Sequence, residues 1–493
     1  MRARSWAPLA SLVAAMGGCS PHHTVAHPAA PVDVPSSYAA TAGDEAVADQ
    51  EAEPERWWVA FGDPELVHLV DEALEHNFQL GAAWARLEQA ESGVMAASSG
   101  YWPQISAQLD VARRRQVVVF GALGTQAFEV NSFGVSVPVS YEVDLWNRIG
   151  HSVSAGALDV VASRDDVEAL AMTLVANVVE AWLNVVHQRA LHALLTEQLA
   201  TNEIFEELVE LRLRHGLGSA LDVYQQRQQV QAARAQLAQI SGAEAVARQQ
   251  LAILVGQAPS AFASGQIGEL PEPTTLPPLP PLPSTGIPSD LLLRRPDVRA
   301  ARRRVAAQDH RVGAAIADQF PQLRFNASVG LSNPSIEGLL SSFVWSLASS
   351  LLAPVLDGGR RAAEVRRNEA ALRERVQTFG QTLLTALFEV ESSLTQERQL
   401  AAQIASLEDQ LSAANATLFE SRRRYSEGLS DYLPVLTALS AVQRTEQSIL
   451  AARRQLLSQR VQLARALGGS WSSELEAPRL PEPEERAEDD DER

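Results

Sequence analysis

The chain has 493 residues, a formal net charge of −19 and 46% hydrophobic residues, so its length suits several ordinary domains or one body built from repeated parts. All 41 basic residues are arginine, which excludes enzymes that need a phosphate-loop or Schiff-base lysine. Residues 33–55 carry seven acids and no base, and residues 474–493 carry ten acids against three arginines. Acidic ends of this kind are typical of solvated tails, so the charge predicts neither a cationic partner nor nucleic-acid binding.

Residues 1–18 have the order of a cleavable signal peptide, with two arginines, an apolar stretch and two glycines before Cys19. They also resemble a bacterial lipoprotein signal, which implies that Cys19 is the lipid anchor and, with Ser20 behind it, that the protein goes to the outer membrane. Cys19 is the sole cysteine, so no intramolecular disulfide can form. No uninterrupted apolar run of 18 residues follows the signal, which predicts that no helix spans a membrane.

Residues 19–56 are rich in proline, alanine, serine and acids, and predict a flexible tether without a metal site. The tether contains His22, His23 and His27. Regular structure is expected from Trp57, with Asp63 capping a helix whose first turn takes Pro64.

The chain then repeats itself. The runs YWPQI at 101–105 and QFPQL at 319–323 each end a helical stretch, and each precedes alternating apolar and polar residues. The two repeats are expected at 57–269 and 289–469, as one architecture made of two similar halves. A proline-rich linker, 270–288, is expected to join them as an extended, exposed spacer, and 470–493 to form an acidic disordered tail.

Alternation with period two predicts two β-hairpins, at 103–143 and 321–354, and therefore four strands. A soluble core could lie beneath such strands. Strands of about 9 to 11 residues suit a tilted bilayer crossing better, because aromatic side chains cluster at one end and Arg113–Arg115 stand at the other. The aromatic residues are Tyr101, Trp102, Tyr141, Trp146 and Phe320.

Four strands cannot close a barrel, and a bilayer offers no water to the unpaired groups of an open sheet edge. The chain is therefore expected to oligomerise. The residues alone leave two copies, with eight strands, or three copies, with twelve.

Two stretches without proline, 139–258 and 355–433, predict two long antiparallel helix pairs of coiled-coil character, at 146–256 and 359–468. Pro434 is expected in the first turn of the last helix. The first helix would be roughly 100 Å long at about 1.5 Å per residue. Each pair turns at a glycine run, RHGLGSAL at 214–221 and YSEGLSDYL at 425–433. Ser219 begins a capping box, and the matching helix is expected to begin near Ser430.

This order of parts resembles the TolC-like outer-membrane channels of tripartite efflux pumps, most closely the lipid-anchored type. Besides both glycine turns, the resemblance rests on WWxxFxDxxL from Trp57 and RRPDVRAA at 294–301. It implies a mainly α fold with membrane β: a homotrimer in outer-membrane lipid, with a twelve-stranded β-barrel and an α-barrel tunnel reaching into the periplasm. It also implies two partners, a periplasmic adaptor (membrane-fusion) protein and an inner-membrane transporter.

The same resemblance assigns the site residues. The periplasmic gate falls on Leu433, with Thr437 where relatives often carry an aspartate and Asp431 as a nearby acid. The strand–helix junctions fall on Asp144, Arg148, Asp357 and Arg360. The adaptor-docking turns are Gly216, Leu217, Gly218, Ser219, Gly428, Leu429 and Ser430.

The predicted function is a passive export duct for drugs or other small molecules, without enzyme activity, cofactor or metal. A secreted hydrolase is disfavoured because the chain has no G-x-S-x-G or H-E-x-x-H motif. Two more functions stay compatible with the sequence: a structural coiled-coil lipoprotein that spans the periplasm, and a type I secretion channel.

Overall fold

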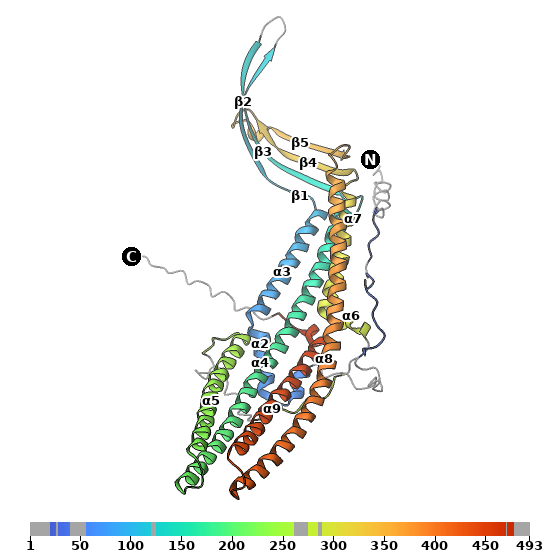
Figure 1. Cartoon of the computed structure of the whole chain (residues 1–493). Coiled ribbons are helices and arrows are strands. Elements are labelled where there is room, and N and C mark those ends of the chain that lie inside the picture. The colour runs from blue at the N-terminus through green and yellow to red at the C-terminus, as the bar shows by residue number, and fades with distance from the viewer. Residues whose placement is uncertain are drawn as a thin grey trace, which may run out of the picture. The chain divides into compact units, whose positions relative to one another are not determined.

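The computed structural model describes residues 20–25, 28–39, 56–119, 125–260, 275–283, 288–469 and 471–477. The signal peptide, Cys19 and most of the acidic tail lie outside the described residues. The chain is mainly helical with one antiparallel sheet (Figure 1). In chain order the helices and strands are η2 (Trp57–Phe61), α2 (Pro64–His76), α3 (Phe78–Ser98), η3 (Ser99–Tyr101), β1 (Gln104–Ile105), β2 (Gln108–Val119), β3 (Thr125–Val143), α4 (Arg148–Arg214), α5 (Ala220–Leu254), η5 (Pro288–Asp290), α6 (Leu291–Arg294), α7 (Pro296–Ala317), β4 (Gln322–Asn333), η6 (Leu339–Ser341), β5 (Phe343–Leu352), α8 (Arg360–Ser426), α9 (Leu433–Leu467) and η7 (Trp471–Glu474).

These elements belong to two compact units. Unit 1 consists of Met1–Pro31, Arg86–Arg164 and Ala300–Gly380 and contains the whole sheet. Unit 2 consists of Val32–Ala85, Asp165–Arg299 and Gln381–Arg493. Each unit takes segments from both repeats, so the duplication does not divide the chain into one unit per repeat.

The sheet of unit 1 pairs β3 with β4 at its centre, although β3 and β4 belong to different repeats. β5 pairs with β4 on one side, and β1 and β2 both pair with β3 on the other. β1 and β2 act as one strand broken at residues 106–107. The four predicted strands are therefore present, and among the described residues the outer edges of β2 and β5 have no strand partner.

The register puts the apolar residues of all four strands on one face. Residues directly opposite each other in an antiparallel pair point to the same face of the sheet. Polar and small residues make up most of the opposite face. Gln108, Ser136 and Gly330 lie side by side there on three neighbouring strands, and Ser328 lies opposite Ser346. The apolar rows are Leu109–Val135–Leu331–Phe343, Val137–Val329–Trp345, Ile105–Val139–Ala327–Leu347 and Val143–Leu323–Leu351.

β3 is longer than the predicted strands. It has 19 residues, and its first part, up to Ser132, pairs with β2 but not with β4. The β2–β3 hairpin therefore extends beyond the four-stranded part, as Figure 1 shows. Arg113–Arg115 stand at the start of this two-stranded extension, where Arg113 pairs with Glu129 in an ion pair. Alternation in the sequence stops near these arginines, and Val117, Val118 and Val119 follow one another, so the extension gave no period-two signal of its own.

α4 and α8 begin in unit 1, and the rest of each lies in unit 2, where α4 pairs antiparallel with α5 and α8 with α9 (Figure 1). By length and composition α4 includes a stretch apolar enough to cross a membrane, and 61% of that stretch is buried inside the protein. This burial fits a core helix. Its buried side chains include Val175, Val178, Leu183 and Val186.

The helix starts follow the predicted capping, with one difference. Asp63 Oδ1 accepts from the backbone N–H of Glu65 at 2.8 Å, and Ser219 and Asp222 form a capping box. α9, however, begins at Leu433 rather than near Ser430, and no side chain caps it. Tyr432 occupies the cap position because its ring is buried, so packing replaces the capping bond.

Two predicted connectors lie against helices where the structure describes them. Tyr38, in the expected flexible tether, is 1% exposed, and the backbone N–H of Ala39 donates to Glu391 at 2.6 Å. In the proline tract, Pro280 is buried and its carbonyl accepts from Arg460. Both observations correct the prediction of solvated connectors, since aromatic burial and a buried arginine hold these residues in place.

Candidate functional site

The two glycine turns of unit 2 have the same backbone geometry. Gly216 has φ 71° and Gly428 has φ 74°, both in the left-handed region. After each glycine, the N–H of a leucine bonds back to the carbonyl five residues earlier: Leu217 to Arg212, and Leu429 to Arg424, each at 2.8 Å. This bond closes a helix C-terminus as in the Schellman motif. The turns are therefore structural equivalents in the two repeats.

Apolar side chains are exposed at both turns. Leu217 and Leu429, at equivalent positions, are 66% and 65% exposed. Leu221 and Leu433, four residues further on, are also exposed. Each turn therefore presents two exposed leucines at the end of its helix pair.

Beneath the turns, aromatic and branched side chains from α4, α5, α8 and α9 form one cluster. Tyr425 and Tyr432 contact each other with ring centroids 5.3 Å apart, and the Arg212 guanidinium lies 4.3 Å from the Tyr425 ring centroid. Burial raises the pKa of the Tyr432 phenol, which therefore stays protonated. The cluster consists of Phe205, Val209, Val223, Tyr425, Tyr432, Val435 and Leu439.

A buried hydrogen bond joins the two helix pairs at this cluster. The Tyr432 hydroxyl donates to Oε1 of Gln226 at 2.8 Å, and Nε2 of Gln226 donates to the carbonyl of Asn202 at 2.7 Å. Gln226 is 0% exposed. One amide side chain on α5 thus bonds both to α4 and to the start of α9.

Amide side chains continue this connection further along the helices. Asn202 Nδ2 donates to Gln443 Oε1 at 3.4 Å, and Gln198 Nε2 donates to the Gln443 carbonyl at 3.2 Å. Gln447 Nε2 donates to Gln198 Oε1 at 2.8 Å. The α4–α9 contact therefore has a buried polar row where a coiled-coil seam would have apolar residues.

The predicted gate residues lie together at the start of α9. Leu433 is 55% exposed, and Thr437 Oγ1 donates to the Leu433 carbonyl at 2.9 Å. Asp431 is exposed, and its carbonyl accepts from Ser430 Oγ at 2.9 Å. Thr437 thus uses its hydroxyl within the helix, which leaves Leu433 and Asp431 as the side chains free to act at a gate.

The predicted strand–helix junctions differ between the repeats. In the first, Arg148 binds Glu142 with two nitrogens, at 2.6 and 3.1 Å, and Asp144 Oδ2 accepts from the N–H of Gly150 at 2.8 Å. The turn between them places Asn147 at φ 60°. In the first repeat, both predicted residues therefore hold the end of β3 to the start of α4.

In the second repeat, Asp357 accepts from the backbone N–H of Arg361 at 3.2 Å and of Gly359 at 3.0 Å. These bonds, the Arg361 bond foremost, hold the pKa of Asp357 below its usual value. The side chain of Arg361 pairs with Asp357 at 3.3 Å, and Arg360, the other predicted junction residue of this repeat, is the first residue of α8. Arg361 also binds Asp318, so it connects this junction to the end of α7.

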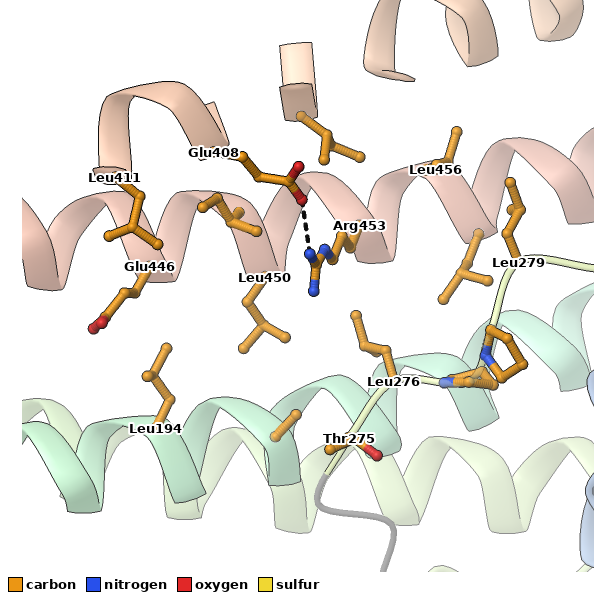
Figure 2. Close-up of a pocket in the computed structure, with 16 residues that line it drawn as sticks. Leu194, Thr275, Leu276, Leu279, Glu408, Leu411, Glu446, Leu450, Arg453 and Leu456 are labelled. Atoms are coloured by element: carbon orange, nitrogen blue, oxygen red, sulfur yellow. Dashed lines mark hydrogen bonds and ion pairs between the residues drawn. The ribbon is translucent and has the colours of Figure 1, made fainter. Parts of the chain in front are cut away.

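Figure 2 shows a groove in unit 2 with a volume of about 790 Å³. Leucine and isoleucine side chains of α4, α8 and α9 line it, and residues 275–279 of the proline tract form one wall. Arg453 and Glu408 form a 2.8 Å ion pair across it. The groove exists because Arg460 holds Pro280 against the helices, a contact that no sequence motif signalled.

A profile of the outer membrane efflux protein family matches residues 69–257 and 287–469, which include both glycine turns and all strands. The chain belongs to this family. Like its relatives, this efflux protein is an outer-membrane component of an efflux system.

Two curated relatives from Pseudomonas aeruginosa cover most of the efflux protein. The pyoverdine export outer membrane protein OpmQ is 31% identical over 85% of this chain and 88% of its own. The outer membrane protein OprJ is 30% identical over 96% of this chain and 97% of its own. Among solved structures, the outer-membrane channel OprN has a TM-score of 0.82 and 26% identity, over 92% of this chain and 99% of that one.

Sequence reasoning missed two residues of the site, Tyr432 and Gln226. Both stand in helix pairs rich in glutamine and leucine, where no motif distinguishes a buried amide from an exposed one. Tyr432 gave one available signal: an aromatic residue directly before the proline-containing first turn of a helix.

Proposed function

We propose that three copies of this efflux protein assemble into a twelve-stranded β-barrel in the outer membrane. The observation that carries the proposal is the sheet itself. Its apolar rows run across four strands, and the outer edges of β2 and β5 offer unpaired backbone groups among the described residues. In lipid these edges need partners, and pairing β5 of one copy with β2 of the next supplies them.

The apolar face of the barrel would contact lipid, and the polar face would line the duct. In each strand the two faces alternate residue by residue, as in membrane barrels with a water-filled interior. The β2–β3 extension beyond Arg113–Arg115 would project past the membrane rim, with the arginines at the height of lipid phosphates.

We further propose that Cys19 carries a lipid at the membrane surface. Ser20, the next residue, lies 2.8 Å from His151 in the first turn of α4, which follows directly on β3. A lipid on Cys19 would therefore start close to the level where the strands end, which is where the inner leaflet of the membrane would lie.

The helix pairs would form an α-barrel tunnel that ends at the glycine turns. There the exposed leucines would contact a periplasmic adaptor, which connects the duct to an inner-membrane transporter. Leu433, with Asp431 and Thr437 beside it, would narrow the mouth of the tunnel. Transport energy would come from the transporter.

The exported compounds would be small molecules. Relatives are named for pyoverdine export and, in Pseudomonas putida, for toluene efflux. A duct whose polar lumen consists largely of serine, glycine and amide side chains selects by size and charge rather than by specific contacts.

The test is reconstitution of the full chain into planar bilayers, together with its mass in detergent. A trimer with stable single-channel conductance is the expected result. A monomer in detergent that does not insert into bilayers would reject the barrel.

A further inference from the structure

The segment that follows Cys19 docks on α4 and α7 of unit 1 through side-chain contacts. Nε2 of His22 binds Asp309 Oδ1 at 2.8 Å, and the backbone N–H of Val25 donates to Asp309 Oδ2 at 2.8 Å. Ser20 Oγ lies 2.8 Å from Nε2 of His151. Asp309 therefore holds the Val25 end of this short segment, and His151 holds the Ser20 end.

Behind this contact, His151 meets a second histidine. Its Nδ1 lies 3.1 Å from Nδ1 of His310, and the two ring centroids are 5.4 Å apart. The His151 ring is 3% exposed. It fits against α7 because residue 313 is glycine: a Cβ there would come within 2.9 Å of the ring. His151 is thus enclosed between the segment and α7, while His310 is half-buried.

The hydrogen bonds of Ser20, His151 and His310 fix which ring nitrogen of each histidine carries a hydrogen when both rings are neutral. The Ser20 hydroxyl donates to the His22 carbonyl at 2.7 Å, so Ser20 Oγ accepts from His151 Nε2–H. A neutral His151 then has a lone pair on Nδ1, and His310 donates its Nδ1–H to it. One added proton can be accommodated on Nδ1 of His151. His310 then carries its own hydrogen on Nε2, so its Nδ1 accepts the hydrogen bond from His151. Two added protons cannot, because both facing Nδ1 atoms would then carry hydrogen.

We propose that His151 and His310 form a proton-sensitive latch, which holds the Ser20 end of the segment while at least one ring is neutral and releases it when both are protonated. Metal binding is not the basis of this site: within the described residues no three histidine, cysteine or acidic side chains are arranged to hold a metal ion.

Burial and the surrounding charges determine whether the two histidines bind protons more readily in the docked or in the released state. The pKa of His151 is lowered, first by burial and then by the charges of His310 and His22. Asp144 and Asp309 act in the opposite direction and raise it. Burial and His22 also lower the pKa of His310, while Asp309 raises it. Each histidine therefore binds its proton more readily when the segment is released.

Docking is consequently favoured above the ordinary histidine pKa of 6.5 and weakens as the pH falls below it. Each unit of pKa depression changes the ratio of docked to released segment by up to about tenfold. The Asp309 contacts oppose release, because the backbone N–H of Val25 donates to this carboxylate whatever the state of the two rings. The latch therefore frees the Ser20 end first.

The test places a nitroxide label on the full-length protein in lipid nanodiscs at position 21, as Pro21→Cys, because this side chain is exposed and lies next to Ser20, at the end that the latch releases. The label is expected to be immobile at pH 8 and to gain a mobile fraction as the pH falls below 6.5. The double variant His151→Gln/His310→Gln is expected to show the same spectrum at pH 8 and pH 5. A label whose mobility does not change with pH in the parent protein overturns the proposal.

Two further variants separate the latch from general acid effects. His310→Gln alone keeps a side chain that can bond to His151 in either protonation state, so the mobile fraction at pH 5 should fall below that of the parent. His187→Gln removes another buried histidine with a lowered pKa, in unit 2, and should leave the transition unchanged. A transition that persists in the double variant, or that disappears in His187→Gln, would also overturn the proposal. The unsubstituted protein, whose sole cysteine is Cys19, is labelled in the same way and its spectrum is subtracted. None of these outcomes depends on conductance.

Discussion

The Tyr432 hydroxyl donates a 2.8 Å hydrogen bond to Gln226 Oε1, and this bond joins the helix pairs of the two repeats just behind the glycine turns. Gln226 is fully buried, so its oxygen has no access to water if the donor is removed. Because burial raises the pKa of Tyr432, the phenol remains a donor up to at least the ordinary tyrosine value of 10.0.

Tyr432→Phe should destabilise this end of unit 2 by about 1–3 kcal/mol, since it leaves a buried acceptor unsatisfied. Faster amide hydrogen exchange at the starts of α5 and α9 is the expected measurement. Tyr224→Phe, on the exposed side of α5, is the matched control and should change nothing. Equal exchange rates in Tyr432→Phe and the unmodified protein would mean that the bond contributes no stability.

Arginine on the two faces of β5 should have opposite consequences. Leu347→Arg places a charge on the apolar face and should cost about 2–4 kcal/mol in the membrane, so less protein inserts. Ser346→Arg, one residue earlier, faces the polar side and should insert normally while shifting ion selectivity towards anions. The measurement is the amount of folded protein in the membrane fraction. Similar losses in both variants would contradict the assignment of the faces.

Leu433→Ala should increase conductance in planar bilayers, because it removes an exposed apolar group from the proposed mouth. Leu221 occupies the equivalent place in the first repeat and is also exposed, so Leu221→Ala is the matched control. Its conductance should stay close to that of the unmodified protein. If both variants conduct alike, Leu433 does not form the constriction.

Alanine at two glycines should change stability in opposite directions. Gly428→Ala forces a Cβ into the left-handed region without a steric contact, and should cost about 1–2 kcal/mol from backbone strain alone. Gly242→Ala lies within α5 in open space and should stabilise by about 0.5–1 kcal/mol. Thermal unfolding measures both. Gly428→Asn should lose less stability than Gly428→Ala, because asparagine tolerates the left-handed conformation. A larger loss in Gly428→Asn would exclude backbone strain as the cause.

Arg295→Met should destabilise unit 2 by about 3 kcal/mol, because it removes the buried ion-pair partner of Asp297 and leaves Glu389 with Arg465 alone. Arg294→Met, at the neighbouring exposed position, is the control. Burial acts to raise the pKa of Asp297, but the hydrogen bond and the charge of Arg295 hold this pKa below 3.8. The stability contributed by this lowered pKa is present above pH 3.8 and is lost as the pH falls through the folded value. The effect of Arg295→Met should therefore shrink in acid.

The regular elements could be predicted because their patterns repeat. Period-two alternation located all four strands, and proline-free stretches located the long helices to within a few residues. Gly216 and Gly428 were recognised as turns because only a residue without Cβ adopts positive φ at so little cost.

The candidate site could be predicted less completely. The gate role of Leu433 stays a prediction. The predicted junction residues Asp144 and Arg148 make hydrogen bonds at the end of β3, and Asp357 pairs with Arg361, which the sequence analysis did not name. Gln226 and His310 gave no usable pattern, and Tyr432 gave only its place before the proline-containing first turn of α9. Their roles arise from contacts with residues more than 150 positions away, and local periodicity carries no information about such contacts.

By itself, the sequence determined which segments are helix, strand and turn, and that four two-faced strands occur in two repeated hairpins, because propensity and periodicity act over a few neighbouring residues. Only the tertiary structure decided that β3 pairs with β4 across the two repeats, that Gln226 bonds to Tyr432, and that His22 reaches Asp309. Long-range pairing depends on how whole elements pack together. Many residues could satisfy the same local pattern, and packing selects the few that meet.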